Sequence, residues 1–69
     1  MSFNRLREAR MMADLEQRDL ARRSGISVRT ISYIENEHLQ PRQNTKRRLL
    51  KGLRVKWQDR ELVFPKGVA

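Results

Sequence analysis

The sequence predicts an all-α protein, a compact bundle of five short helices. Apolar residues recur at the three-to-four-residue spacing of a helix face along most of the chain. Gly25 and Ser27, residues that typically end and cap helices, stand between two of these stretches. The 69 residues suffice for one domain of marginal stability, because a chain of this size buries only about 60% of its unfolded surface. We expect a core over residues 3–64 and a loose tail over residues 65–69.

The first helix is expected from about Ser2 to Met12. Its inward stripe consists of Phe3, Leu6, Ala9, Arg10 and Ala13. A guanidinium thus lies in the middle of an apolar face, and a carboxylate should meet it because an unpaired buried charge is costly. Glu35 is the best candidate, since it lies at the edge of the buried face of a later helix. The alternative is that Arg10 extends along the surface and keeps its charge in water.

Two short helices joined by a tight turn follow, over residues 17–24 and 27–36. Gly25 suits a left-handed end of the first, and the hydroxyl of Ser27 can accept a free backbone N–H at the start of the second. Ile31 and Ile34 of the second helix face inward. Its opposite face carries Val28, Arg29, Ser32, Tyr33 and Asn36. That face holds no carboxylate and offers amide, hydroxyl and guanidinium donors, so it is suited to reading a binding partner.

Residues before and after these two helices extend the pattern of small, apolar and polar residues over most of the chain. The matching positions are Leu6, Arg10, Leu15, Gln17, Leu20, Ala21, Gly25, Ser27, Ile31, Ile34, Glu35, Asn36, Pro41, Leu49, Leu53 and Val55. From about Asn4 to Val55 the chain resembles the five-helix DNA-binding domains of the lambda-repressor and Cro family. The resemblance implies a helix-turn-helix at residues 17–36, and a salt bridge between Arg10 and Glu35.

If the resemblance holds, the second helix of the motif enters the major groove of DNA. Bases would then be read by Val28, Arg29, Ser32 and Tyr33. A forked contact from Arg29 to guanine and a contact from Val28 to a thymine methyl suit the chemistry of these side chains. Phosphates or the minor groove would be contacted by Arg10, Gln17, Arg18, Ser27, Asn36 and Arg42. For Gln17 and Arg42 the alternative is an ordinary solvated side chain.

Three positions depart from the family pattern, which favours glycine near Asp14, at Glu37 and at Arg54. Asp14 could instead cap the helix that follows it. Asn36 could take the left-handed conformation in place of the residue after it. Glu37 also brings a negative charge close to the expected position of DNA.

A fourth helix, capped by Asn44 or Thr45, is expected to run to about residue 53, and a short fifth helix is expected around residues 57–63. Trp57 is expected to plug the core. Two roles stay open for Val63 and Phe64, which either complete the core or form a patch for a second subunit. Relatives make their dimer contact at this end of the domain, so the resemblance allows the second role.

The composition favours a polyanionic partner and excludes several classes of site. Basic residues number 16 against 8 acidic ones, a net charge of +8. Twelve are arginines, which suit forked contacts to phosphate and guanine, although the charge could also serve solubility alone. With no cysteine and a single histidine, we expect no disulfide, no metal site and no cofactor. With no apolar run of about 18 residues and no signal peptide, we expect a cytoplasmic protein.

Together these features predict a sequence-specific transcriptional regulator that binds double-stranded DNA. We expect a phage or mobile-element repressor in a bacterial cell, associated with the nucleoid, that binds an inverted-repeat operator as a homodimer. One alternative is a protein-interaction module of the same fold, an antirepressor or co-repressor acting on a partner repressor. Another is non-specific coating of nucleic acid, which would be steeply salt dependent. The sequence contains no credible catalytic constellation, so an enzyme is not expected.

Overall fold

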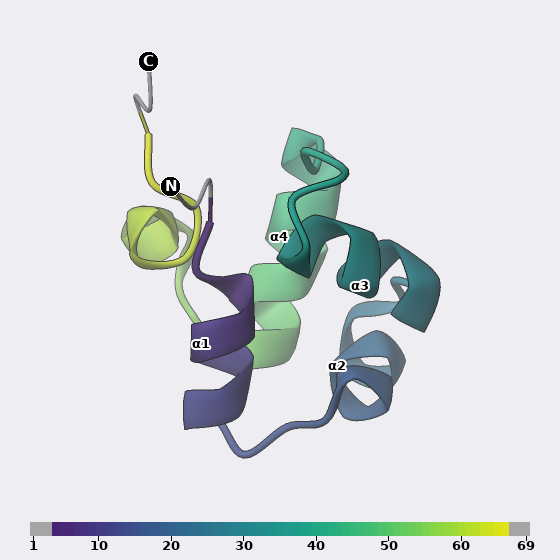
Figure 1. Cartoon of the computed structure of the whole chain (residues 1–69). Helices are drawn as coiled ribbons and strands as arrows, with labels where there is room; N and C mark the ends of the chain where they lie inside the picture. The colour runs from purple at the N-terminus through teal and green to yellow at the C-terminus, as the bar shows by residue number, and fades with distance from the viewer. Residues whose placement is uncertain (1–3, 67–69) are drawn as a thin grey trace.

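A computed structural model describes residues 4–66, and over this range the chain forms five helices and no strand. The helices are α1 (Leu6–Met12), α2 (Gln17–Ser24), α3 (Val28–Glu35), α4 (Gln43–Leu53) and η1 (Trp57–Leu62), of which η1 is a 3-10 helix. Figure 1 shows α2 and α3 to the right of the bundle, with α1 and the yellow-green η1 to the left. The expected all-α bundle of five short helices is confirmed. Phe3, which was expected on the inward stripe, lies outside the described residues.

The start of α1 is fixed by Asn4, and the helix therefore begins later than its apolar spacing predicts. The side-chain oxygen of the buried Asn4 accepts the backbone N–H of Leu6 at 3.0 Å. Its amide nitrogen donates to the carbonyl oxygen of Ile34 at 3.0 Å. The backbone N–H of Arg5 donates to the carbonyl oxygen of Val63 at 2.7 Å. These contacts join the start of α1 to the end of α3 and to the C-terminal segment.

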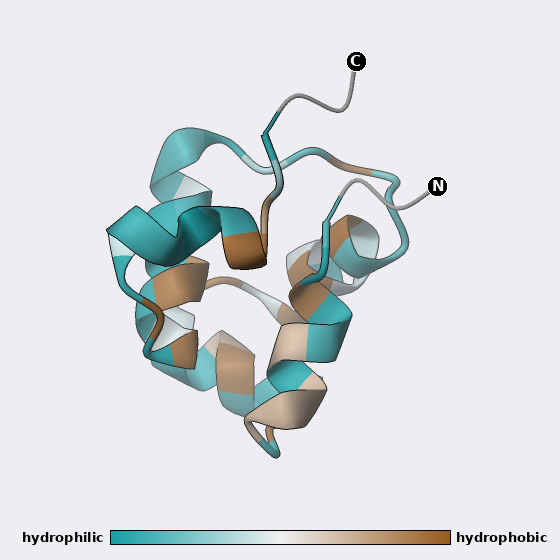
Figure 2. Ribbon diagram, turned by 90° about the vertical axis from the view of Figure 1, so that its left-hand side faces the viewer, coloured by the Kyte–Doolittle hydropathy of each residue, from teal (hydrophilic) through white to brown (hydrophobic). Residues whose placement is uncertain are grey.

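The core is built from the inward apolar positions of the first four helices and from the residues that follow η1. Its most deeply buried side chains are Leu6, Leu20, Ile31, Ile34, Leu49, Leu50 and Val63. Figure 2 shows hydrophobic positions on the inner sides of the helices and hydrophilic positions over most of the outer surface. Because full burial of such a side chain contributes about 1.5–3 kcal/mol, these positions determine which face of each helix turns inward.

The packing of α4 against α2 requires glycine at position 52. A Cβ on Gly52 would lie 2.9 Å from Cδ1 of Leu20 and 3.4 Å from the Cβ atoms of Arg23 and Ser24. Leu20 is fully buried, so its side chain has little room to move aside. Glycine lowers the helical propensity of α4. The close approach to α2 explains why it is nevertheless present.

The C-terminal segment closes the bundle through Val63 and Phe64. These residues are 1% and 5% exposed, so both belong to the core, and their own surfaces leave almost nothing exposed for a second subunit. Trp57 packs against the core as expected, but it covers the edge of the core and does not fill it, because it is only half-buried. The guanidinium groups of Arg47 and Arg60 lie 4.0 and 4.7 Å from the centroid of its ring. Trp57 therefore carries two cation–π contacts at the surface.

Three connections between helices contain a residue other than glycine in the left-handed conformation. They are Asp14, Glu37 and Arg54, with φ angles of 57°, 62° and 61°. These are the same three positions at which the lambda-repressor and Cro family favours glycine. The chain thus takes the left-handed conformation at these connections with side chains for which it is strained.

Three sequence-based expectations about helix ends are corrected by these connections. Asp14 does not cap α2, because the N-cap residue is Glu16, whose backbone N–H donates to the carboxylate of Asp19 at 2.9 Å. Asn36 has a φ of −90° and does not take the left-handed conformation. Neither Asn44 nor Thr45 caps α4, because Arg42 takes the N-cap position and the helix begins at residue 43.

Candidate nucleic-acid interface

The turn between α2 and α3 is fixed by local hydrogen bonds. Gly25 takes the left-handed conformation with a φ of 74°, and its N–H donates to the carbonyl oxygen of Ala21 at 2.9 Å. The hydroxyl oxygen of Ser24 accepts the N–H of Ile26 at 3.1 Å. The hydroxyl oxygen of Ser27 accepts the N–H of Thr30 at 3.1 Å and so caps α3. With these bonds in place, α3 crosses α2 at a defined orientation.

The outward face of α3 carries all four residues expected to read bases. Ile31 and Ile34 are fully buried, so the opposite side of the helix faces solvent. On that side Val28 and Tyr33 are 41% and 42% exposed, and Arg29 is exposed as well. Ser32 is half-buried, and its hydroxyl oxygen accepts the side-chain N–H of the exposed Asn36 at 3.3 Å. The face therefore offers one apolar group, one guanidinium and several neutral hydrogen-bonding groups.

A buried ion pair holds α3 against α1. Arg10 Nε lies 2.7 Å from Glu35 Oε2, Arg10 Nη2 donates to Glu35 Oε1 at 3.2 Å, and Arg10 Nη1 donates to the carbonyl oxygen of Leu15 at 2.8 Å. The two side chains are 13% and 3% exposed. The hydrogen bond with Glu35 raises the pKa of Arg10, against the opposing effect of burial. The carboxylate meets the guanidinium in the interior, as the inward position of Arg10 required.

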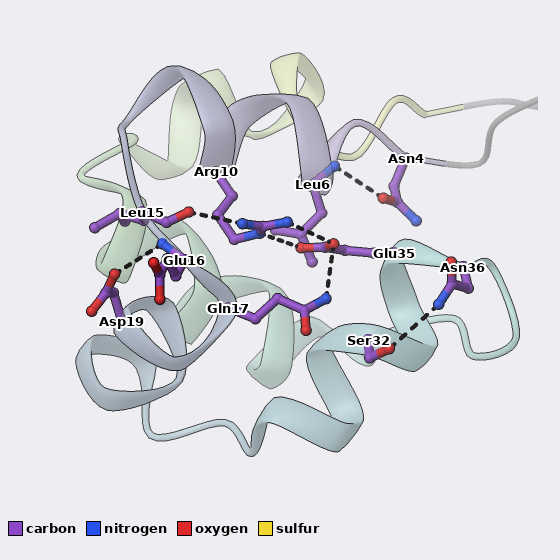
Figure 3. Close-up of polar contacts among 10 residues, drawn as sticks. All are labelled: Asn4, Leu6, Arg10, Leu15, Glu16, Gln17, Asp19, Ser32, Glu35 and Asn36. Carbon is purple, nitrogen blue, oxygen red and sulfur yellow. Dashed lines mark hydrogen bonds and ion pairs between the residues drawn. The ribbon is translucent and has the colours of Figure 1, made fainter.

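This network also includes Gln17, the first residue of α2. Its amide nitrogen donates to Glu35 Oε1 at 3.1 Å, the oxygen that already accepts from Arg10 (Figure 3). One carboxylate therefore ties α1, α2 and α3 together. Because every guanidinium nitrogen of Arg10 donates inside the protein, this geometry argues for its structural role and against a phosphate contact.

Three of the other residues expected to contact phosphate stand at helix N-termini. Gln17 opens α2, Ser27 caps α3, and Arg42 is exposed in the N-cap position of α4. Free backbone N–H groups at helix N-termini favour a bound phosphate, but the carboxylates of the Glu16 and Asp19 capping box already occupy part of the N-terminus of α2. Arg18 is exposed and pairs with Glu16, with Nε 2.9 Å from Oε1. This pair lies at the surface, where such contacts contribute little, so Arg18 is available to another anion.

Arg48 of α4 lies close to the turn between α2 and α3, although it was not among the residues expected at the site. A Cβ atom added to Gly25 would lie 4.0 Å from Nη1 of Arg48. The positive charge of Arg48 therefore lies beside the turn between α2 and α3. Its neighbour Arg47 covers the ring of Trp57 instead. The signal in the sequence was the basic run at residues 46–48. Successive residues of a helix point in different directions, so the members of such a run have different surroundings.

Residues 4–66 contain neither a candidate metal site nor a candidate membrane-spanning helix. Over this range no group of three or more histidine, cysteine or acidic residues could hold a metal ion. Within the same part of the chain, no helix is long and apolar enough to cross a membrane.

Comparison with protein families gives one match, to a helix-turn-helix family model over residues 6–59. No curated protein and no solved structure matches the chain. The matched region includes α1 to α4 and the start of η1, and thus the whole α2–α3 unit and the ion pair behind it. Domains of this family bind DNA and are typically not catalytic. The chain therefore belongs to the helix-turn-helix family of the lambda-repressor and Cro type.

Proposed function

We propose that this protein is a sequence-specific regulator of transcription that reads an operator in double-stranded DNA with α3. The observation that carries the proposal is the outward face of this helix. It is free of carboxylates, exposes Val28, Arg29 and Tyr33, and is held in place by the buried pair of Arg10 and Glu35. The exposed face of a helix that contacts only solvent usually carries Glu and Lys, whereas this face carries neutral donors and an arginine.

In this proposal α3 enters the major groove with its N-terminal end first. The two terminal nitrogens of Arg29 fork onto O6 and N7 of a guanine, and Val28 contacts a thymine methyl. Gln17 and Ser27, at the N-termini of α2 and α3, hold phosphates and set the register of the helix on the duplex. Arg18, Asn36 and Arg42 add phosphate or minor-groove contacts.

The regulator acts as a homodimer on an inverted repeat, with half-sites about one DNA turn apart. Occupation of a promoter by such a dimer represses transcription. A phage or mobile-element repressor in the bacterial cytoplasm fits this small domain and its basic charge. The excess of 16 basic over 8 acidic residues adds attraction to the backbone, which speeds association but carries no sequence information.

A second candidate function is favoured by an apolar groove of about 660 Å³ between α1 and the C-terminal segment. The groove is lined by Arg5, Glu8, Ala9, Met12, Ala13, Val55, Leu62 and Val63. Met12 and Leu62 are 86% and 67% exposed, and exposed apolar patches often mark protein interfaces. In Figure 1 this side of the bundle lies opposite α2 and α3, so a partner repressor could dock there. The protein would then act as an antirepressor or co-repressor.

Selection from a random duplex library tests the proposal. The purified protein is mixed with the library at about 150 mM salt, and the enriched duplexes compete with scrambled ones, because the backbone contribution is strongly reduced by salt. Enrichment of an inverted repeat supports a dimeric regulator and removes the second candidate. Weak binding without enrichment, lost as the salt rises, contradicts the proposal.

The variant Leu62→Lys tests whether the groove is used when the protein binds its operator. It places a charge in the groove and leaves α3 untouched. An autonomous regulator that does not use the groove keeps the operator affinity of the wild type. If the variant loses cooperative binding to the inverted repeat while keeping its binding to a single half-site, the groove is the contact between the two subunits.

A further inference from the structure

Arg29 and Tyr33 form a preordered pair on the outward face of α3. They are four positions apart, so their side chains lie on the same side of the helix. Arg29 Nε donates to the hydroxyl oxygen of Tyr33 at 3.1 Å, and the guanidinium carbon lies 5.5 Å from the centroid of the tyrosine ring. The arginine is thus held both by a hydrogen bond at one nitrogen and by the face of an aromatic ring.

The hydrogen bond to Tyr33 determines which nitrogens of Arg29 remain available to contact DNA. A guanidinium can present two parallel N–H groups either at its end, through Nη1 and Nη2, or at its side, through Nε and one Nη. The hydroxyl of Tyr33 takes Nε, so the side edge is closed and the end remains available. Guanine offers O6 and N7 in the major groove at the spacing of such a pair of donors.

From this geometry we infer that Tyr33 is a positioning residue, which presents the end of Arg29 to a guanine and does not itself read a base. The inference rests on the proposed function of α3 and defines which side chain determines specificity there. An exposed arginine that moves freely among its rotamers must be ordered at the moment of binding. Tyr33 supplies part of that order before DNA arrives, so its removal weakens the preference for guanine at the position that Arg29 reads.

A double-mutant cycle on the selected operator tests this role. Tyr33→Phe removes the hydroxyl and keeps the ring. We expect it to reduce discrimination between the operator and the same operator changed at the single G·C pair by about three- to tenfold. Affinity for scrambled DNA and its salt dependence should stay unchanged. In the background of Arg29→Ala, Tyr33→Phe should have no further effect, since the side chain that it positions is gone.

Trp57→Phe is the matched control. It keeps an aromatic ring and changes an arginine–aromatic contact on η1, where Arg47 and Arg60 lie over the ring of Trp57, and it leaves Arg29 and Tyr33 in place. This variant should keep the wild-type preference at the guanine read by Arg29. A loss there equal to that of Tyr33→Phe would mean that the effect does not come from the pair on α3, and would overturn the inference.

Two further results would overturn the positioning role and leave the proposed function standing. One is a loss of affinity from Tyr33→Phe that persists in the Arg29→Ala background, because Tyr33 would then touch DNA itself. The other is unchanged discrimination in Tyr33→Phe. Exchange of the Arg29 Nε proton with water, followed by NMR in the free protein, is the readout that needs no DNA. It should accelerate in Tyr33→Phe but not in Trp57→Phe, and equal rates in the wild type and both variants would refute the pair whatever the protein binds.

Discussion

Arg54 shows how single residues in this chain carry conformational strain. It ends α4 with a φ of 61°, a conformation that Asp14 and Glu37 share at two other connections. A left-handed conformation costs an ordinary residue about 1–2 kcal/mol, while glycine adopts it freely but loses about 0.5–1 kcal/mol more entropy on folding. The strain of the ordinary residue exceeds the entropy cost of glycine, so glycine at these three positions would make the protein more stable.

The variant Arg54→Gly should therefore stabilise the protein by about 0.5–1 kcal/mol. For a domain of this size the melting temperature should rise by about 2–8 °C, which calorimetry or circular dichroism measures. Gly25→Ala is the control, because it introduces the same strain at a φ of 74° and should lower the melting temperature. A lower melting temperature for Arg54→Gly would show that contacts of the arginine outweigh the strain.

Glu35 is the residue on which three helices depend. Its carboxylate is 3% exposed and accepts hydrogen bonds from Arg10 and Gln17. Removing one partner of a buried pair leaves the other charge uncompensated, so Glu35→Ala should lower the free energy of unfolding by about 3–5 kcal/mol. Urea denaturation measures this change, with Glu61→Ala as the exposed control. An unchanged midpoint in Glu35→Ala would exclude a stabilising role for the pair.

The direction of the pKa shift of Arg10 determines how the stability contributed by its pair with Glu35 depends on pH. The folded-state pKa of Arg10 is raised, chiefly by the hydrogen bond with Glu35. A raised pKa gives stability that is complete below the ordinary pKa of the group and is lost only as the pH rises through the folded value. Arginine titrates far above neutrality. Deprotonation of Arg10 should thus cause no loss of stability between neutral and mildly alkaline pH, and a loss there would have to come from another group.

At the scale of the helices, α2, α3 and η1 were predicted closely, whereas the start of α1 was not. Gly25 and Ser27 determine their own turn through bonds to neighbouring residues, so local sequence is sufficient. The start of α1 depends instead on a bond from Asn4 to Ile34, which no local pattern contains. The same holds for Trp57, whose place at the surface depends on Arg47 from another helix. Periodicity predicts which face of a helix turns inward, but contacts between helices decide the boundaries.

The candidate site shows the same division. Spacing alone placed Val28, Arg29 and Tyr33 on one face of α3 and directed Arg10 towards a carboxylate. It could not show that Arg29 bonds to Tyr33, because rotamers are not encoded in residue spacing. The family resemblance, for its part, assigned Gln17 to a phosphate without indicating that its amide binds Glu35.

The contact of α4 with α2 gives a prediction at the element scale. Gly52→Ala should improve helical propensity by about 1 kcal/mol, yet destabilise the protein by about 1–3 kcal/mol through overpacking against Leu20. The steric effect wins because a Cβ would lie 2.9 Å from a fully buried side chain. Thermal unfolding decides the sign, and the double variant Gly52→Ala with Leu20→Val should recover part of the loss. A stabilised Gly52→Ala would contradict the close packing of α2 on α4.

At the scale of the whole molecule, two surfaces on opposite sides of the bundle differ in their chemistry. The α2–α3 side presents arginines and neutral donors, together with the carboxylates of Glu16 and Asp19 at the start of α2. The groove at α1 and the C-terminal segment presents Met12 and Leu62, with Arg5 and Glu8 of opposite charge among its lining residues. The core and the buried ion pair keep both surfaces in one rigid unit of marginal size.

The central claim, that the outward face of α3 reads bases, is tested most directly by the binding of Arg29→Ala to the selected operator and to all single-base variants of it. We predict a loss of about 1–3 kcal/mol on the operator, relaxed preference at one base-pair position and unchanged affinity for scrambled DNA. An equal loss on every sequence, with a smaller salt dependence, would make Arg29 a phosphate contact and contradict the claim.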